Sequence, residues 1–138
     1  NYPLNHIYAL DVVRIIQELI ERGVGIGKAY NIAQDEHLSL EDFLALLAEI
    51  MDVSTPDIVR FPRKELEAQG LMPDCSPFSE RWMSALDNSR SKAELGISYT
   101  PLAEYLTEIV TEFEENPPPE PSSYRRRKAE LQLVRMAN

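Results

Sequence analysis

The chain has few of the residues that mark disulfide-rich, metal-binding or membrane-spanning proteins. Its single cysteine, Cys75, cannot form an intrachain disulfide, which fits a reducing compartment. The two histidines, His6 and His37, are far from that cysteine in sequence, so the spacing of a tetrahedral zinc site is missing. The longest apolar runs, such as 43–47, are much too short to cross a bilayer, and no secretory signal opens the chain. We therefore expect a cytoplasmic protein without a metal site or a membrane span.

Positive charge is also scarce. The 138 residues include 14 lysines and arginines against 23 aspartates and glutamates, a formal net charge of -9. Nucleic acids and anionic membranes bind clustered cations, so this balance argues against both as general partners. A composition that is 43% hydrophobic and 27% charged is ordinary for a globular domain of this length.

The spacing of the apolar residues predicts a mostly helical chain. The expected helices are 10–20, 39–51, 62–69, 88–95, 101–113 and 124–136. Ser39 with Asp42 three residues later forms a reciprocal N-cap pair, and Thr100-Pro101 is a second helix start. Two short segments, 28–33 and 57–61, are expected to be strands.

Three segments together resemble one enzyme family. They are 4–13 (LNHIYALDVV), 28–33 followed by 39–43 (KAYNIA and SLEDF), and 86–102 (LDNSRSKAELGISYTPL). In this order they are similar to the carboxy-terminal part of the extended short-chain dehydrogenase/reductases, which are NAD(P)-dependent sugar-nucleotide epimerases and dehydratases. The resemblance covers about residues 4–116. It departs from the family at Ala9, where an aspartate is usual, and in lacking an Arg-x-Gly-Asp motif.

The resemblance implies a helix-rich α/β fragment. Residues 1–33 would be the last helix and strand of a Rossmann-like nucleotide-binding sheet, and residues 34–116 a small, mostly helical substrate-binding domain. A proline-rich spacer (117–123) and a basic helix or tail (124–138) would follow. The parent enzyme would bind NAD or NADP and act on a sugar nucleotide or a similar hydroxylated substrate. The fragment by itself is expected to bind no cofactor and to be inert.

Two patterns match parts of such an enzyme but stand in the wrong context. The glycines at 23, 25 and 27 follow a helix and precede an expected strand, whereas a dinucleotide fingerprint follows a strand and opens a helix. Tyr124 and Lys128 have the spacing of the family's catalytic Tyr-x-x-x-Lys pair, but they follow the proline-rich spacer near the end of the chain. We interpret the first as a flexible turn and the second as part of a solvated helix.

The candidate substrate-binding residues are mainly arginines. The resemblance implies that an arginine ahead of the 86–102 segment grips the substrate diphosphate, because a guanidinium binds phosphate oxygens bidentately. Arg81 lies in that neighbourhood, and its alternative role is a surface ion pair with Glu80 or Asp87. Arg60 and Arg63 are further candidates for contact with the substrate.

His37 is the remaining candidate. It lies in the loop after the expected strand 28–33, at the carboxyl edge of the implied sheet, where ligands of open sheets gather. It would either line a cavity of the intact enzyme or simply occupy the loop ahead of Ser39.

Two other classes of function stay open. The basic run 125–128 is the cue for a non-catalytic relative that binds RNA, which a strong salt dependence of binding would reveal. The alternative is a free-standing helical interaction module. In the enzyme fragment, the helix face carrying Val13, Ile16 and Ile20 and the strand 29–33 would lack the parent sheet that they pack and pair against, so self-association through this surface is expected.

Overall fold

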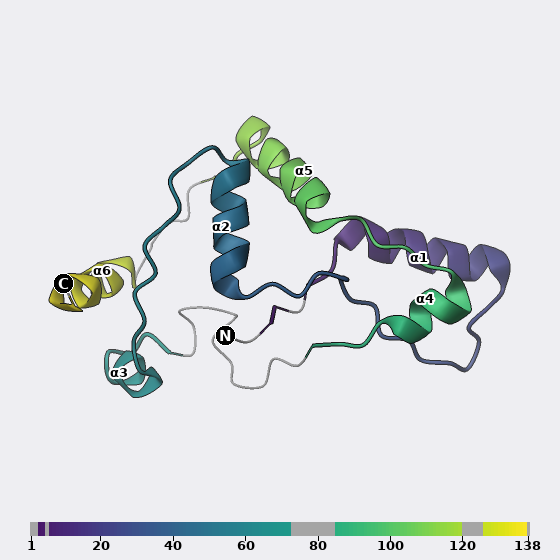
Figure 1. Cartoon of the computed structure of the whole chain (residues 1–138), viewed down its shortest axis with the longest axis horizontal. Helices are drawn as coiled ribbons and strands as arrows, with labels where there is room; N and C mark the ends of the chain where they lie inside the picture. The colour runs from purple at the N-terminus through teal and green to yellow at the C-terminus, as the bar shows by residue number, and fades with distance from the viewer. Residues whose placement is uncertain (1–2, 5, 73–84, 120–125, 138) are drawn as a thin grey trace.

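The structure is a computed structural model that describes residues 3–4, 6–72, 85–119 and 126–137. These residues contain six helices joined by irregular links (Figure 1). They are α1 (Ala9–Arg22), α2 (Leu40–Ile50), α3 (Arg63–Ala68), α4 (Ser89–Leu95), α5 (Leu102–Glu115) and α6 (Arg127–Ala137). The six helices expected from the sequence are confirmed, with ends that differ by a few residues.

The expected α/β architecture is wrong. Among the described residues no strand forms, and the β-type pairing found there is an isolated bridge between Pro3 and Ser39. Segment 28–33 has no regular secondary structure, and side chains of α4 and of its N-cap residue bind its carbonyls: Arg90 donates to Ala29 O at 3.1 Å and Asn88 to Ala33 O at 2.9 Å. A neighbouring strand would need those acceptors. The Rossmann-like sheet is therefore not supported, and a small helical fold replaces it.

The second expected strand, 57–61, is also wrong. It runs as an irregular link between α2 and α3, bounded by Pro56 and Pro62. Proline has no backbone donor for a ladder, and within the described residues no strand lies beside this link to pair with it.

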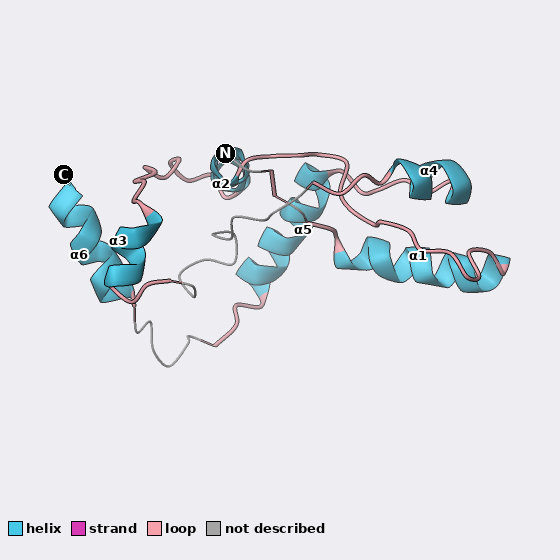
Figure 2. Cartoon of the chain, turned by 90° about the horizontal axis from the view of Figure 1, so that it is seen from below, coloured by secondary structure: helices cyan, strands magenta, loops and turns pink. Residues whose placement is uncertain are grey.

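The helices lie in three pairs along an elongated molecule (Figure 1). α1 and α4 occupy one end, α2 and α5 the middle, and α3 and α6 the other end. The view from below shows the same succession (Figure 2).

Two apolar clusters hold the first two pairs together. The cluster at the α1 end is built from four buried residues, Ile15, Leu95, Ile97 and Tyr99. Half-buried Tyr30 and Ile32 pack against it, whereas Ala29 and Asn31 are exposed. The alternation expected for a strand is thus present in 28–33 without a sheet, because only one side of the segment faces the cluster.

The central cluster joins α5 to α2. Leu102, Tyr105 and Leu106 are its buried residues, and Phe43 and Leu46 of α2 pack against them. Tyr8, just ahead of α1, stacks on the Tyr105 ring with 4.9 Å between centroids and 6° between planes. Because Ile7 packs against the first cluster and Tyr8 against the central one, the residues just ahead of α1 connect the first pair of helices to the second.

Local signals account for the helix ends. Ser39 Oγ accepts the Asp42 amide at 3.2 Å while the Asp42 carboxylate accepts the Ser39 amide at 3.4 Å, which confirms the expected capping pair. Gly23 and Gly96 end α1 and α4 with φ of 61° and 71°, a left-handed conformation that glycine adopts without strain. Pro101 keeps an extended ψ of 140°, so α5 begins one residue later than the sequence indicates.

One face of α1 is apolar and exposed. Val13, Ile16 and Ile20 are 59%, 52% and 75% accessible, while the opposite face buries Asp11 and Ile15. Among the described residues, no helix has the length and hydrophobicity that a membrane span requires.

Candidate functional site

Arg60 and Arg63, two of the predicted substrate-binding arginines, lie on a link and on a helix, respectively. The Arg60 guanidinium donates to the carboxylate of Glu41 on α2. Arg63 opens α3, and its Nε donates to Glu67 Oε1 on the same helix at 2.8 Å. Both pairs are solvent-exposed. Each arginine therefore has a local acidic partner, and such exposed pairs contribute little to stability.

The other two candidates are His37 and Arg81. His37 is exposed in the link between Glu36 and α2. Arg81 lies outside the described residues, so its role stays a prediction.

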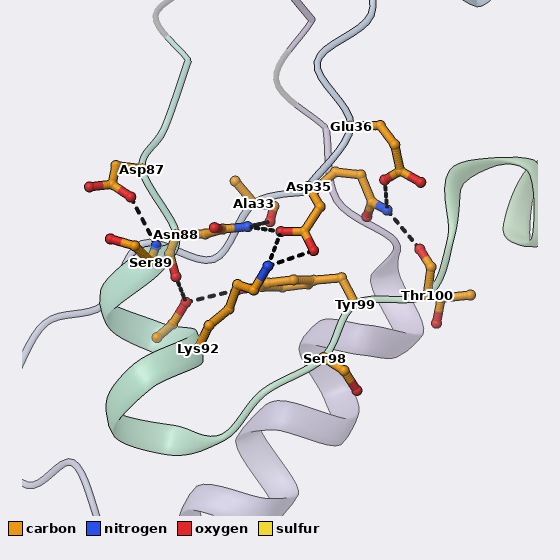
Figure 3. Close-up of polar contacts among 12 residues, drawn as sticks. Ala33, Asp35, Glu36, Asp87, Asn88, Ser89, Lys92, Ser98, Tyr99 and Thr100 are labelled. Atoms are coloured by element: carbon orange, nitrogen blue, oxygen red, sulfur yellow. Dashed lines mark hydrogen bonds and ion pairs between the residues drawn. The ribbon is translucent and has the colours of Figure 1, made fainter.

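What the structure does bring together is the 86–102 segment and the loop after segment 28–33 (Figure 3). The amide of Asn88 donates to Ala33 O at 2.9 Å and to Asp35 Oδ1 at 2.7 Å. Lys92, one turn further along α4, donates to both Asp35 oxygens at 2.9 and 3.0 Å. The cation and the Asn88 amide together lower the pKa of Asp35. We call the group of Asn88, Lys92 and Asp35 the α4 clamp.

The residues around the α4 clamp serve the helix itself. Asp87 Oδ1 accepts the Ser89 amide at 2.9 Å, which caps the start of α4 and lowers the pKa of Asp87. Ser91 is fully buried, and its hydroxyl donates to Asn88 O at 2.7 Å and lies 2.9 Å from the Tyr99 hydroxyl. These contacts are made within α4 and its immediate surroundings, and Asp87 is the side chain that caps the helix.

A second set of contacts holds the start of α5. Glu36 Oε1 accepts the Leu102 amide at 3.0 Å, and its other oxygen accepts Gln34 Nε2 at 2.6 Å. Gln34 also donates to Thr100 O at 2.7 Å. Although partial burial acts in the opposite direction, these donors hold the pKa of Glu36 below its usual value. The first turn of α5 is therefore capped by a residue 66 positions earlier.

Asp11 completes the polar framework from α1. Its side chain is buried, with Oδ2 accepting the Thr100 amide at 2.8 Å and Oδ1 accepting the Thr100 hydroxyl at 2.9 Å. Arg14 donates to Oδ1 at 2.9 Å. Burial alone would raise the pKa of Asp11, but these hydrogen bonds outweigh it and the pKa is lowered.

His6 lies between the rings of Phe43 and Tyr105, 6.1 Å from each centroid. Its Nδ1 is 2.5 Å from the Tyr105 hydroxyl, and its Nε2 is buried without a hydrogen-bond partner among the described residues. Burial lowers the pKa of His6 and raises that of Tyr105. The pair is therefore held neutral, which suits a role in packing.

The three-glycine turn after α1 does not have the context of a dinucleotide-binding fingerprint. The turn with Gly25 leads into a segment without regular secondary structure instead of a helix, so this turn places no helix N-terminus beside a pyrophosphate. A Cβ at Gly25 would meet the side chains of Leu19 and Tyr30 at 3.4 Å, so side chains of α1 and of segment 28–33 occupy the space beside this turn. No group of three or more potential metal ligands gathers in the described parts of the chain.

The polar residues that matter most escape the sequence patterns. Asp11, Gln34 and Glu36 make their contacts across 66 to 89 positions of sequence. One signal was available: Asp11 stands four residues before Ile15, on the same side of the helix as this apolar residue. A carboxylate in that position indicates a buried partner.

Comparison with protein-family models, with curated proteins and with solved structures found no match to this chain.

Proposed function

We propose that this chain is the carboxy-terminal, substrate-side portion of an enzyme resembling the extended short-chain dehydrogenase/reductases. The observation that carries the proposal is the bonding of the family-like segments to one another. Residues of 86–102 contact 28–33 and the loop after it through the α4 clamp, and Thr100 contacts 4–13 through Asp11. Segments that match a family motif by chance have no reason to form one hydrogen-bonded unit.

The proposed role is positioning of the substrate. The polar groups of the framework are committed to helix caps and to links between segments, so the chain supplies no free acid/base pair from them. An upstream portion of the parent enzyme would supply the cofactor site and the Tyr-x-x-x-Lys pair. The substrate class implied by the resemblance is a sugar nucleotide, with Arg81 as its diphosphate ligand.

The exposed face of α1 supports an upstream partner domain. Val13, Ile16 and Ile20 form an apolar stripe that soluble proteins seldom leave uncovered. In the parent enzyme this stripe would pack against the cofactor-binding portion.

The test is to recover the coding sequence upstream of Asn1 and to compare the longer protein with the 138-residue chain. We expect calorimetric titration to show NAD or NADP binding by the longer protein and none by the chain alone. A glycine fingerprint and a Tyr-x-x-x-Lys pair should lie upstream. Micromolar cofactor binding by the chain alone, or an upstream sequence without both motifs, would refute the proposal.

A second candidate is a helical interaction module, and the same exposed stripe of α1 favours it. Under this alternative the chain functions without an upstream enzyme, and Val13→Glu should abolish partner binding. In the enzyme proposal the same substitution instead destabilises the longer protein, which a thermal melt of both lengths distinguishes.

A further inference from the structure

An open groove with an apolar floor and an acidic border runs between the start of α1 and the end of α5. It encloses about 550 Å³. Leu10, Ile109 and Phe113 line it and are 60%, 49% and 55% exposed. Glu108 and Glu112 line it as well, where Glu108 accepts the Tyr8 hydroxyl and Glu112 accepts the Asn116 amide at 3.0 Å.

The helix that carries this groove is strongly acidic. α5 contains five glutamates and no lysine or arginine. Negative charge concentrated around exposed apolar side chains favours an occupant that is both apolar and basic, because complementary potentials attract the partner and suppress others.

α6 has the complementary surface. Leu131 is 40% exposed. Arg127 stands four residues before it, Lys128 three residues before it and Arg135 four residues after it. Side chains at these intervals share one face of a helix, so an apolar residue is flanked by three cations. The opposite side of α6 carries Leu133, which is buried.

Within one molecule α6 is held away from the groove. Leu133 and Leu71 line one pocket with Leu66 of α3, and Arg126 donates to Leu71 O at 3.3 Å. Both views place α6 beside α3 and apart from α5 (Figures 1 and 2). The charged face of α6 is therefore presented outward.

We propose that two copies of this chain associate reciprocally, with the Arg127–Lys128–Arg135 face of α6 from each copy docked in the α5 groove of the other. Leu131 enters between Ile109 and Phe113, and the cations lie against Glu108 and Glu112. A twofold arrangement uses both grooves and both α6 helices, so the assembly closes as a dimer. The dimer does not rest on the proposed function, since it uses other surfaces than the α4 clamp.

The first experiment is sedimentation equilibrium of the 138-residue chain at low and high salt. We expect a dimer whose dissociation constant rises at least about tenfold between low and high ionic strength, because its charge pairs are screened. The double variant Glu108→Lys/Glu112→Lys should weaken it by at least about tenfold, and so should Arg127→Glu/Lys128→Glu. The control is Glu114→Lys, which reverses a single glutamate of α5 outside the groove.

The second experiment is a charge-swap mixture. In each double variant the groove and α6 carry charges of the same sign, so its copies repel one another. In an equimolar mixture of the two variants, the reversed groove of one can bind the reversed α6 of the other, and the two unchanged surfaces can also bind. The dimer should therefore return in the mixture. Because all four positions are exposed, circular dichroism should show unchanged helix content. Zero-length cross-linking of mixed ¹⁴N and ¹⁵N chains should join Lys128 of one copy to Glu112 of the other, which needs no variant.

A monomer at low salt would overturn the proposal. A dimer whose dissociation constant is unchanged by the charge reversals, or rises equally with Glu114→Lys, would also overturn it. A mixture that fails to recover the dimer, or a Lys128–Glu112 cross-link found only within single chains, would also overturn it.

Discussion

Replacing Asp11 by asparagine tests whether the polar framework fastens α1 to the start of α5. The Asp11 carboxylate is 2% exposed and accepts two hydrogen bonds from Thr100 and one from Arg14. A hydrogen bond to a charged group contributes about 1.5 to 3 kcal/mol, and an amide oxygen keeps at most part of the Thr100 interaction. Arg14 is 41% exposed, so its share is less than about 1 kcal/mol. We therefore expect Asp11→Asn to lower the free energy of unfolding by about 2 to 3 kcal/mol.

Urea denaturation followed by circular dichroism measures this loss. Asp57→Asn makes the same chemical change at an exposed position and should stay within about 0.5 kcal/mol of the unmodified chain. The pKa of Asp11 is lowered in the folded state, so its contribution is present above the unfolded pKa of about 3.9 and is lost as pH falls. The difference between the unmodified chain and Asp11→Asn should therefore shrink as pH is lowered from about 5. Equal midpoints for both variants, or a difference that grows on acidification, would refute the reasoning.

Three further predictions concern the candidate site. Asn88→Ala should lower the free energy of unfolding by about 1 to 2 kcal/mol, because it removes a donor to a backbone carbonyl and to Asp35. Lys92→Met should lower it by less than about 1 kcal/mol, because the ion pair of Lys92 is exposed. A lower urea midpoint for Lys92→Met than for Asn88→Ala would contradict this prediction. His6 has a lowered pKa in the folded state, so stability should fall as pH drops below about 6.5, and His6→Gln should remove that dependence; a midpoint that is flat in the unmodified chain from pH 7 to 5 would count against it. In the full-length enzyme, Arg81→Ala should weaken substrate affinity about ten- to hundredfold with cofactor binding unchanged, and steady-state kinetics equal to the unmodified enzyme would exclude the diphosphate role.

Helix positions could be predicted because their signals are local. The capping pair of Ser39 and Asp42 and the glycine at 96 act within one turn of the helices they delimit. The periodicity of apolar residues adds to them, and hydrogen bonds between residues four apart need no distant partner. These features depend on short stretches of sequence, and the structure keeps them.

The expected strands were wrong for the complementary reason. Alternation in 28–33 shows that one side of the segment faces an apolar cluster, but it does not reveal what pairs with the backbone. A strand exists only when a neighbour accepts its ladder of hydrogen bonds. In this chain the side chains of Arg90 and Asn88 bind the carbonyls at Ala29 and Ala33 instead.

The sequence by itself determined the positions of the helices, the Ser39–Asp42 cap, the acidic composition and the lack of an intrachain disulfide, since each follows from composition or from neighbours within a turn. Only the tertiary structure decided which face of α1 is buried, that Glu36 caps α5 and that Asp35 is the partner of Lys92. Those choices join residues that lie far apart along the chain. They depend on which clusters form together, and a pattern with a period of a few residues carries no information about that.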